Sequence, residues 1–135
     1  MKVNMNMLRI MDKTGSLRDA LRPLRQGDLN INFLSATSID GKYGLIYLLP
    51  KQPTQTLNFP KANVVFGSLD IEVILVTIKD EIGALIKLLD PIADAGVYLN
   101  FCFAFSTDGG NAVAILGVPH NKLQKVQDIL SQHNN

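Results

Sequence analysis

Residues 10–23, IMDKTGSLRDALRP, and residues 78–91, IKDEIGALIKLLDP, are two versions of one motif. The two segments align without a gap at an offset of 68 residues, and identical residues continue to match at this offset beyond them. The further matches are Asn32 with Asn100, Phe33 with Phe101, Ala36 with Ala104, Ser38 with Ser106, Asp40 with Asp108, Gly41 with Gly109 and Leu48 with Leu116. The chain is therefore an internal repeat of two copies, which is too few for a solenoid and suits a pseudo-symmetric pair.

Length and composition limit the classes of protein to consider. A chain of 135 residues makes one ordinary domain, or two very small ones that share a core. With 47% hydrophobic and 19% charged residues, the chain can bury a sizeable core and is not a disordered segment. A net charge of +1 gives no broad attraction to phosphate backbones or anionic lipids. We expect neither a nucleic acid nor a membrane as partner.

Cysteine content and the N-terminal sequence indicate the compartment. Cys102 is the single cysteine, so no intrachain disulfide can form. Residues 1–6 contain no uninterrupted apolar run, and no stretch approaches the roughly 20 apolar residues of a membrane helix. We expect a cytoplasmic protein.

Each copy begins with the pattern of a strand followed by a helix. The β-rich runs 3–11 and 71–78 both break at Asp-x-x-Gly, and leucines then recur at helical spacing. Pro23 and Pro91 come late in the two predicted helices, where a missing N–H and a ring clash should kink or shorten the last turns.

A second strand and a hairpin come after the helix in each copy. Residues 97–106 alternate strictly, and we expect the face with the bulky residues to meet the helices. That face consists of Val97, Leu99, Phe101, Phe103 and Phe105. Asp40-Gly41 and Asp108-Gly109 are hairpin signals, which lead into strands near 43–49 and 112–117.

The two copies differ after the hairpin. In the second copy Pro119 precedes a predicted helix with apolar residues on one face, and no length remains for a fourth strand. In the first copy residues 51–60 predict a loop or one helical turn, followed by a short strand at 63–66. We expect two domains: residues 1–69, with a degenerate second helix, and residues 70–135, which lack the fourth strand.

Both copies resemble ACT domains. The resemblance rests on an Asp and a Gly three residues apart at the end of the first strand, on apolar helical positions and on the start of the second strand. The matching residues are Asp12, Gly15, Leu17, Leu21, Leu24, Asn30 and Ile31 in the first copy, and Asp80, Gly83, Leu85, Leu89, Ile92, Gly96, Val97 and Leu99 in the second. The resemblance implies an α+β, ferredoxin-like βαββαβ fold with antiparallel sheets and helices on one face. It also implies a regulatory module that binds an amino acid.

The strand-to-helix corners are the candidate ligand sites. The glycine lets the backbone approach a ligand, and the first-turn N–H groups behind it can bind a carboxylate. Asp12, Asp80 or the side-chain carbonyl of Asn30 would accept the ligand ammonium. The candidate binding residues are Asp12, Thr14, Gly15, Ser16, Asn30, Asp80, Ile82, Gly83 and Ala84. In the alternative interpretation the glycine merely makes the turn, and the aspartate merely favours the positive end of the helix.

Two further sets of polar residues have open interpretations. Asn32 and Asn100 fall inside predicted strands, where an amide needs a partner from a ligand or across a subunit interface. Three arginines, at positions 18, 22 and 25, follow one face of the first helix. They form either a solvated stripe or a surface that pairs with Asp90 and Asp94 of the second helix.

The sequence offers no catalytic set and no metal or cofactor site. His120 and His133 lack the spacing of metal ligands, and Cys102 lies in a strand among phenylalanines, where we expect a buried and inert thiol. Gly-rich phosphate loops and nucleophile elbows are missing from the sequence. We therefore expect a protein that is not an enzyme.

Two functions remain. The first is a regulatory module that senses a small molecule, an amino acid by resemblance, and modulates a metabolic enzyme or its own assembly. The second is an interaction or dimerisation protein that binds no ligand. We expect a homodimer, because a face away from the helices should carry mostly small apolar residues and one sheet edge should be open. The residues assigned to that face are Ile74, Val76, Cys102, Ala104 and Leu116.

Overall fold

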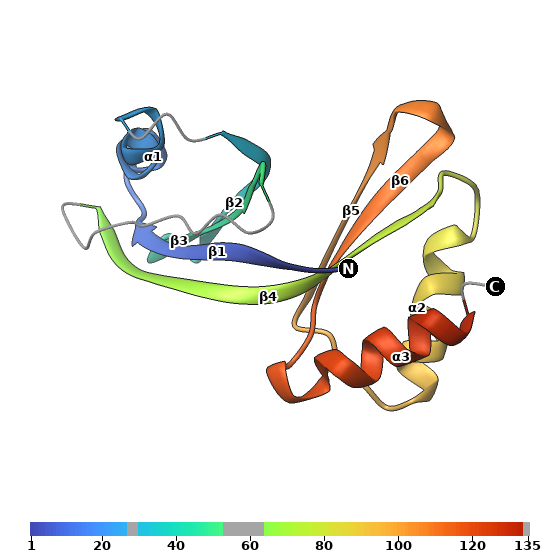
Figure 1. Ribbon diagram of the computed structural model, residues 1–135. Helices are drawn as coiled ribbons and strands as arrows, with labels where there is room; N and C mark the ends of the chain where they lie inside the picture. Colours follow the sequence, from blue (N-terminus) through green and yellow to red (C-terminus); the bar gives the residue numbers. More distant parts are fainter. Residues whose placement is uncertain (27–29, 53–63, 134–135) are drawn as a thin grey trace. The chain divides into compact units, whose positions relative to one another are not determined.

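A computed structural model describes residues 1–26, 30–52 and 64–133 (Figure 1). It is α+β, and its observed strand pairs are antiparallel, as predicted. The elements follow the order β1 (Lys2–Met11), α1 (Ser16–Gln26), β2 (Ile31–Ile39), β3 (Tyr43–Pro50), β4 (Val65–Lys79), α2 (Ala84–Asp94), β5 (Phe101–Thr107), β6 (Asn111–Gly117) and α3 (Leu123–His133). Most of the loop predicted at 51–60, and residue 63 of the predicted short strand, lie outside the described residues.

The chain forms two compact units, which we call the first unit (residues 4–71) and the second unit (residues 1–3 and 72–135). The strands are hydrogen-bonded in the order β2-β3-β1-β4-β6-β5. β1 and β4 each contribute residues to both units. β4 is one strand of 15 residues, Val65–Lys79, whereas the sequence predicted two separate strands, 63–66 and 71–78.

In the first unit, α1 covers one face of strands β1 and β3. Its buried residues Ala20 and Leu24 pack against apolar side chains of the sheet. The buried core residues are Leu8, Ile10, Ala20, Leu24, Ile46, Leu48, Val64 and Val65. The helix forms because its leucines repeat at helical spacing, and it ends at Gln26, one turn after Pro23.

A buried amide in the first unit escaped the sequence analysis. Asn6 of β1 is 2% exposed, and its Nδ2 donates a hydrogen bond of 2.7 Å to Asp70 of β4. The hydroxyl of Ser68 donates to the Asn6 side-chain oxygen at 3.3 Å. These bonds tie β1 to β4, and they satisfy an amide that would be costly to bury alone.

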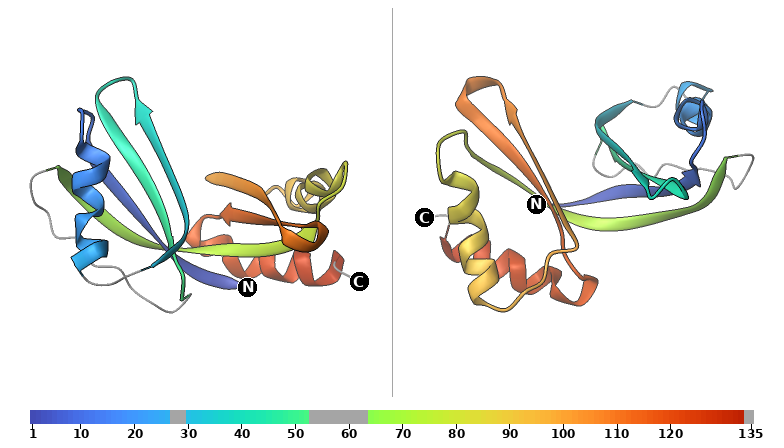
Figure 2. Two further views of the ribbon diagram at one scale, coloured as in Figure 1. Left: turned by 90° about the horizontal axis from the view of Figure 1, so that it is seen from above. Right: turned by 180° about the vertical axis from the view of Figure 1, so that it is seen from behind.

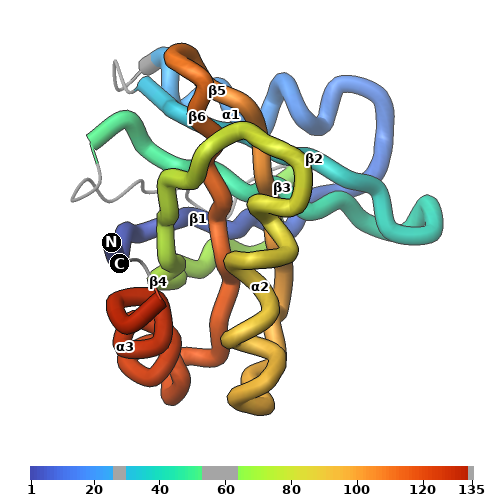
Figure 3. Tube along the Cα trace, turned by 90° about the vertical axis from the view of Figure 1, so that its right-hand side faces the viewer, coloured from blue at the N-terminus to red at the C-terminus, as the bar shows by residue number. Residues whose placement is uncertain are grey.

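In the second unit, α2 and α3 contact each other and cover one face of β4 and β6 (Figures 2 and 3). Leu88 and Ile92 of α2 belong to the same hydrophobic cluster as Val126 of α3. The buried core residues are Ile74, Val76, Leu88, Ile92, Val97, Ala114, Leu116, Val118, Leu123, Val126 and Leu130. The helix predicted after Pro119 is confirmed as α3.

The N-terminus adds a strand segment to the second unit. The N-terminal ammonium of Met1 donates to the Leu75 carbonyl at 3.1 Å, and Leu75 donates its N–H to the Met1 carbonyl at 2.9 Å. This exchange of both bonds is the hydrogen-bonded pair of an antiparallel ladder. The edge at which a fourth strand was expected to be missing is therefore paired at Leu75 by the start of the chain.

The prediction about the faces of the second strand is wrong for Phe101, Phe103 and Phe105, although Val97 and Leu99 of the same predicted face do pack in the core beneath α2 and α3. Cys102 lies opposite Leu116 and Ala104 lies opposite Ala114, and both of these partners belong to the core beneath α2 and α3. Directly opposed residues share a face of the sheet. The bulky residues of β5 therefore lie on the face away from the helices; they are Phe101, Phe103 and Phe105.

The same register corrects the basis of the predicted dimer. Ile74, Val76 and Leu116 were assigned to the face away from the helices, but they are buried beneath α2 and α3. Alternation gives the period of a strand and does not say which of its faces is covered. β5 also begins at Phe101 and not near residue 97, because Val97 donates its N–H back to the Ile92 carbonyl at the end of α2.

Both predicted hairpin turns are confirmed. Asp40 and Gly41 both have positive φ, 53° and 67°, in a three-residue loop between the paired residues Ile39 and Tyr43, and Lys42 donates its N–H to the Ile39 carbonyl at 2.9 Å. In the second unit the turn is a 3₁₀ segment, Asp108–Gly110.

In the part of the chain that the structure describes, no helix combines the length and the apolar character needed to span a bilayer.

Candidate functional site

The first strand-to-helix corner lies between the end of β1 and the start of α1. Gly15 has φ +84°, a left-handed conformation that glycine adopts without strain. Ser16 donates its N–H to the Lys13 carbonyl at 3.1 Å, and the helical ladder begins with Asp19 N–H to the Gly15 carbonyl at 3.0 Å. The N–H groups of Leu17 and Arg18 therefore come before the first ladder bond and belong to the donors that a helix start leaves for other acceptors.

A side-chain hydrogen bond links this corner to β2. The hydroxyl of Ser38 donates to Asp12 Oδ2 at 2.6 Å. A carboxylate accepts several hydrogen bonds at once, so the bond to Ser38 leaves Asp12 with further capacity for a ligand donor. Ser38 also fixes the direction of that carboxylate.

A hollow of about 190 Å³ opens at the first corner, and every residue that lines it belongs to the first unit. Its polar walls include Asp12, Ser16 and Ser38, and its apolar walls come from β1, β2, β3 and the start of α1. The lining residues are Ile10, Met11, Asp12, Lys13, Ser16, Leu17, Ala36, Thr37, Ser38, Gly44 and Leu45. We call this space the first-corner hollow.

Ser16 is the most unusual residue of the first-corner hollow. It is 2% exposed, and its hydroxyl has no hydrogen-bond partner among the described residues. Burying a hydroxyl without a partner costs about 1–3 kcal/mol, so such a group calls for an explanation. A small polar ligand or water in the hollow would supply the partner.

The second corner repeats the geometry of the first with different side chains. Gly83 has φ +84°, and Ser106 donates its hydroxyl proton to Asp80 Oδ2 at 2.7 Å. Ala84 replaces the buried serine, and it lines a different hollow, of about 120 Å³ between α2 and α3. Ile82 is fully exposed at this corner.

Not every predicted site residue lines the first-corner hollow. Asp12 and Ser16 do, whereas Thr14, Gly15 and Asn30 are not among its lining residues. The Asn30 side-chain oxygen accepts the N–H of Ile31 at 2.9 Å, so this residue caps the start of its own strand.

Of the paired asparagines, Asn32 lies near the start of β2 and Asn100 lies just before β5. Asn32 is exposed at an irregularity in the pairing of β2 with β3. Asn100 is exposed and precedes β5, where its N–H donates to the Gly117 carbonyl at 2.7 Å. The expectation of a strand position is therefore confirmed for Asn32 and wrong for Asn100.

Two of the three arginines of α1, Arg18 and Arg22, interact within their own helix. Arg18 and Arg22 lie 3.1 Å and 3.3 Å from Asp19 Oδ1. The hydrogen bond from Arg18 holds the pKa of Asp19 below its ordinary value. Pairing of this helix face with Asp90 and Asp94 stays a prediction.

Neither a group of metal ligands nor the cysteine is found at the two corners in the described part of the chain. Among the described residues, no three His, Cys, Asp or Glu side chains gather in a way that could hold a metal ion. Cys102 is exposed and not buried as predicted: it lies on the same face as the helices, but on the edge strand β5, where Ala104 and Ser106 are exposed as well. Partial desolvation raises the pKa of its thiol.

Comparisons with known proteins identify the fold. No protein-family model and no curated protein matches the sequence. The structure of protein BT0572 from Bacteroides thetaiotaomicron superposes with a TM-score of 0.80 at 15% identity, over 99% of this chain and 90% of that one. The regulatory subunit of aspartate kinase from Thermus thermophilus, in its ligand-free form, superposes with a TM-score of 0.59 at 12% identity, over 99% and 93%. The chain therefore has the fold of ACT-type regulatory domains.

A third similar structure places this fold within a larger chain. Aspartate kinase from Clostridium acetobutylicum, described as an allosteric enzyme, superposes with a TM-score of 0.59 at 11% identity. The match covers 99% of this chain and 33% of that one. At such identities the likeness concerns the fold alone.

Sequence reasoning missed Ser38 and Ser106 as site residues. Both align at the 68-residue offset, and each lies in the strand beside its corner. The available signal was that an identical serine occurs at the same position of both copies. The sequence did not show that these serines bond to the aspartates, because that contact depends on the sheet register, which places β1 and β2 on either side of β3.

Proposed function

We propose that the protein is a regulatory module that binds a small amino acid in the first-corner hollow. The observation that carries this proposal is the buried hydroxyl of Ser16, which has no partner among the described residues and lines a hollow beside Asp12. The ACT-type fold supports the proposal, because an aspartate kinase regulatory subunit and an allosteric aspartate kinase share it.

The chemistry of the walls matches the two ends of an amino acid. The N–H groups at the start of α1 would receive the carboxylate, which the positive end of the helix also stabilises. Asp12, held by Ser38, would receive the ammonium. Ser16 would donate to the ligand or accept from it.

The volume of the hollow favours a small ligand. Drug-sized ligands occupy pockets of about 300–1,000 Å³. The first-corner hollow measures about 190 Å³, and apolar residues such as Ile10, Leu17 and Leu45 line part of it. We therefore propose an amino acid with a short side chain.

Thr14, Gly15 and Asn30 complete the proposed site as residues that shape the corner and the strand beside it. The equivalent residues Asp80, Ile82, Gly83 and Ala84 would form a second, weaker or vestigial site. Ala84 offers no hydroxyl where Ser16 has one, so we propose that the first corner binds more tightly.

Partners are part of the same proposal. Ligand binding would favour one arrangement of the chain over another and so alter its contacts with a metabolic enzyme or with a second copy. We keep the two repeats, 1–69 and 70–135, the homodimer and the cytoplasmic location as proposals. Light scattering at tens of micromolar protein should give the mass of a dimer, and a monomer mass would contradict that part.

A thermal-shift screen of the free amino acids tests the proposed function. A ligand that binds only the native state raises the melting temperature. We expect a small, uncharged amino acid to raise it, and bulky ones such as tryptophan to leave it unchanged. If no amino acid changes it at millimolar concentration, the ligand-free interaction protein becomes the better hypothesis.

A further inference from the structure

A second hollow, of about 430 Å³, lies in the second unit between the edge of β4 and helix α3. All of its lining residues belong to the second unit, and they come from Met1, from residues 74–77 of β4 and from one side of α3. The α3 residues are Gln124, Gln127, Asp128, Leu130 and Ser131. We call this space the β4–α3 groove.

Backbone N–H and C=O groups of β4 face this groove and could pair with another strand. Leu75 exchanges both of its hydrogen bonds with Met1, so its N–H and C=O point to the groove edge. Backbone groups alternate in direction along a strand, which gives Thr77 the same edge as Leu75. Thr77 is exposed, and no described strand residue lies opposite it on that side. Unpaired edges of this kind accept extended peptides.

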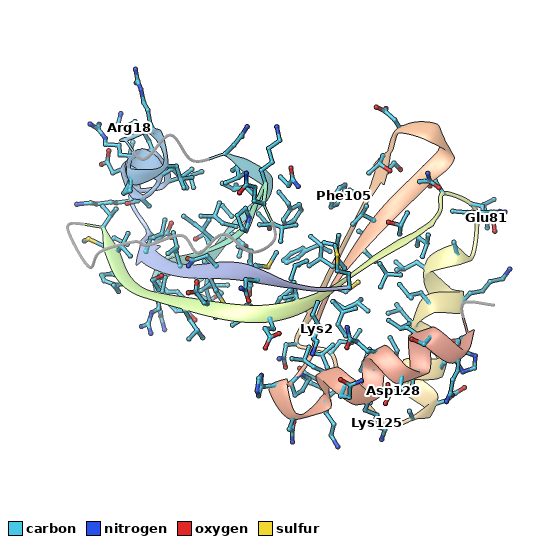
Figure 4. All side chains as sticks on the ribbon, viewed as in Figure 1. Lys2, Arg18, Glu81, Phe105, Lys125 and Asp128 are labelled. Atoms are coloured by element: carbon cyan, nitrogen blue, oxygen red, sulfur yellow. The ribbon has the colours of Figure 1, made fainter. Side chains whose placement is uncertain are left out.

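The groove also selects the side chains of an added strand. Residues placed opposite Val76 and Ile78 would lie on the helix-covered face of the sheet, and so toward α3. Asp128 is exposed on α3 (Figure 4). Gln124 Nε2 donates to its Oδ1 at 3.0 Å. Asp128 is the one charged side chain among the described residues that line the groove, and the N-terminal ammonium of Met1, bonded to the Leu75 carbonyl, is the other charged group there.

The cation nearest in sequence is directed elsewhere. The ammonium of Lys125 donates to the Ala95 carbonyl at 3.2 Å, and Lys125 does not line the groove. The carboxylate of Asp128 is therefore left without a described cationic partner, and its charge complements a basic side chain.

We propose that the β4–α3 groove binds an extended segment of a partner polypeptide. The segment adds to the edge of β4 as an antiparallel strand, continues the pairing that Met1 begins at Leu75, and places a lysine or arginine against Asp128. Backbone hydrogen bonds to Thr77 hold the added segment on β4, and the contact of its basic side chain with Asp128 makes the groove prefer basic segments.

The test uses the full chain and a fluorescent hexapeptide, acetyl-Thr-Lys-Val-Lys-Val-Thr-amide, in an anisotropy titration. Thr77→Pro removes the N–H that faces the groove and spares the β6 ladder, because proline is tolerated where an edge strand has no partner for its N–H. We expect this variant to bind the peptide about tenfold more weakly or worse, as the loss of a paired backbone bond predicts. The matched control, Thr77→Val, keeps the N–H and should bind like the wild type.

A second variant covers the case in which Thr77→Pro fails to fold. Asp128→Lys changes only an exposed side chain, and it should abolish binding of the lysine peptide and allow binding of the same peptide with glutamate in place of lysine. Lack of saturable binding by the folded wild type at millimolar peptide would overturn the proposal. Equal affinity of the wild type, folded Thr77→Pro and Asp128→Lys would overturn it as well.

Discussion

The hydroxyl of Ser38 donates a 2.6 Å hydrogen bond to Asp12. Ser106, which lies 68 residues further along the chain, makes the same bond to Asp80 at 2.7 Å. In both units this bond ties the strand before the helix to the strand after it. The repeat therefore preserves a contact between two elements and not merely a local turn. The difference between the two corners lies one step away, in Ser16 and Ala84.

Removal of either serine hydroxyl should destabilise its unit modestly. Ser38→Ala and Ser106→Ala each delete one exposed hydrogen bond to a carboxylate, so we expect a loss of about 0.5–1.5 kcal/mol in the free energy of unfolding. The double variant should lose the sum of both, because the pairs are separate. Urea titration measures these losses, and a loss above about 3 kcal/mol for either variant would refute the assignment.

Substitution of the corner glycines should expose backbone strain. A Cβ added at Gly83 would meet no atom within 4 Å, so Gly83→Ala isolates the cost of its φ of +84°, about 1 kcal/mol. At Gly15 a Cβ would also come to 3.0 Å from Arg18 Nη2, the movable end of a flexible side chain. We expect the two alanine variants to differ little in urea unfolding. Asparagine, which tolerates this conformation, should cost less than alanine at both positions.

Gly117 should tolerate no side chain, for a packing reason and not a conformational one. It lies opposite Phe101, and a Cβ at this position would overlap with the phenylalanine ring. We expect Gly117→Ala to cost about 1–3 kcal/mol. In a Phe101→Leu background the cost should fall, because a smaller side chain leaves room. Equal costs in the two backgrounds would show that the ring is not the obstacle.

Cys102 should react slowly with thiol reagents despite its exposure. Burial raises the pKa of the thiol in the folded chain, so at any pH near neutrality less reactive thiolate is present than in the unfolded chain. A plot of reaction rate against pH should reach its midpoint at higher pH for the native protein than for the protein in urea. Coincident midpoints would contradict this.

The sequence predicted the local features well, because each one depends on neighbouring residues. The helix after Gly15, the helix after Gly83 and the turn at Asp40-Gly41 all arise from residues a few positions apart. The aspartates and glycines of the corners were found for the same reason.

The features that the sequence analysis missed depend on distant parts of the chain. The start of the chain pairs with Leu75, and no local pattern announces that contact. The alternation of residues 101–106 was recognised, but which face the helices cover depends on the register of β5 with β6. The buried Asn6 needed the position of β4 before its partner Asp70 could be named.

The most direct test of the proposed function is an NMR titration of the ¹⁵N-labelled protein with each amino acid. We expect one small amino acid to shift the backbone amide signals of residues 10–13, 16, 17, 36–38, 44 and 45, which line the first-corner hollow. Ser16→Ala should weaken the binding about tenfold, as loss of one polar contact predicts, and the matched Ser106→Ala should leave it unchanged. Shifts confined to other parts of the chain, or no shifts with any amino acid, would contradict the account.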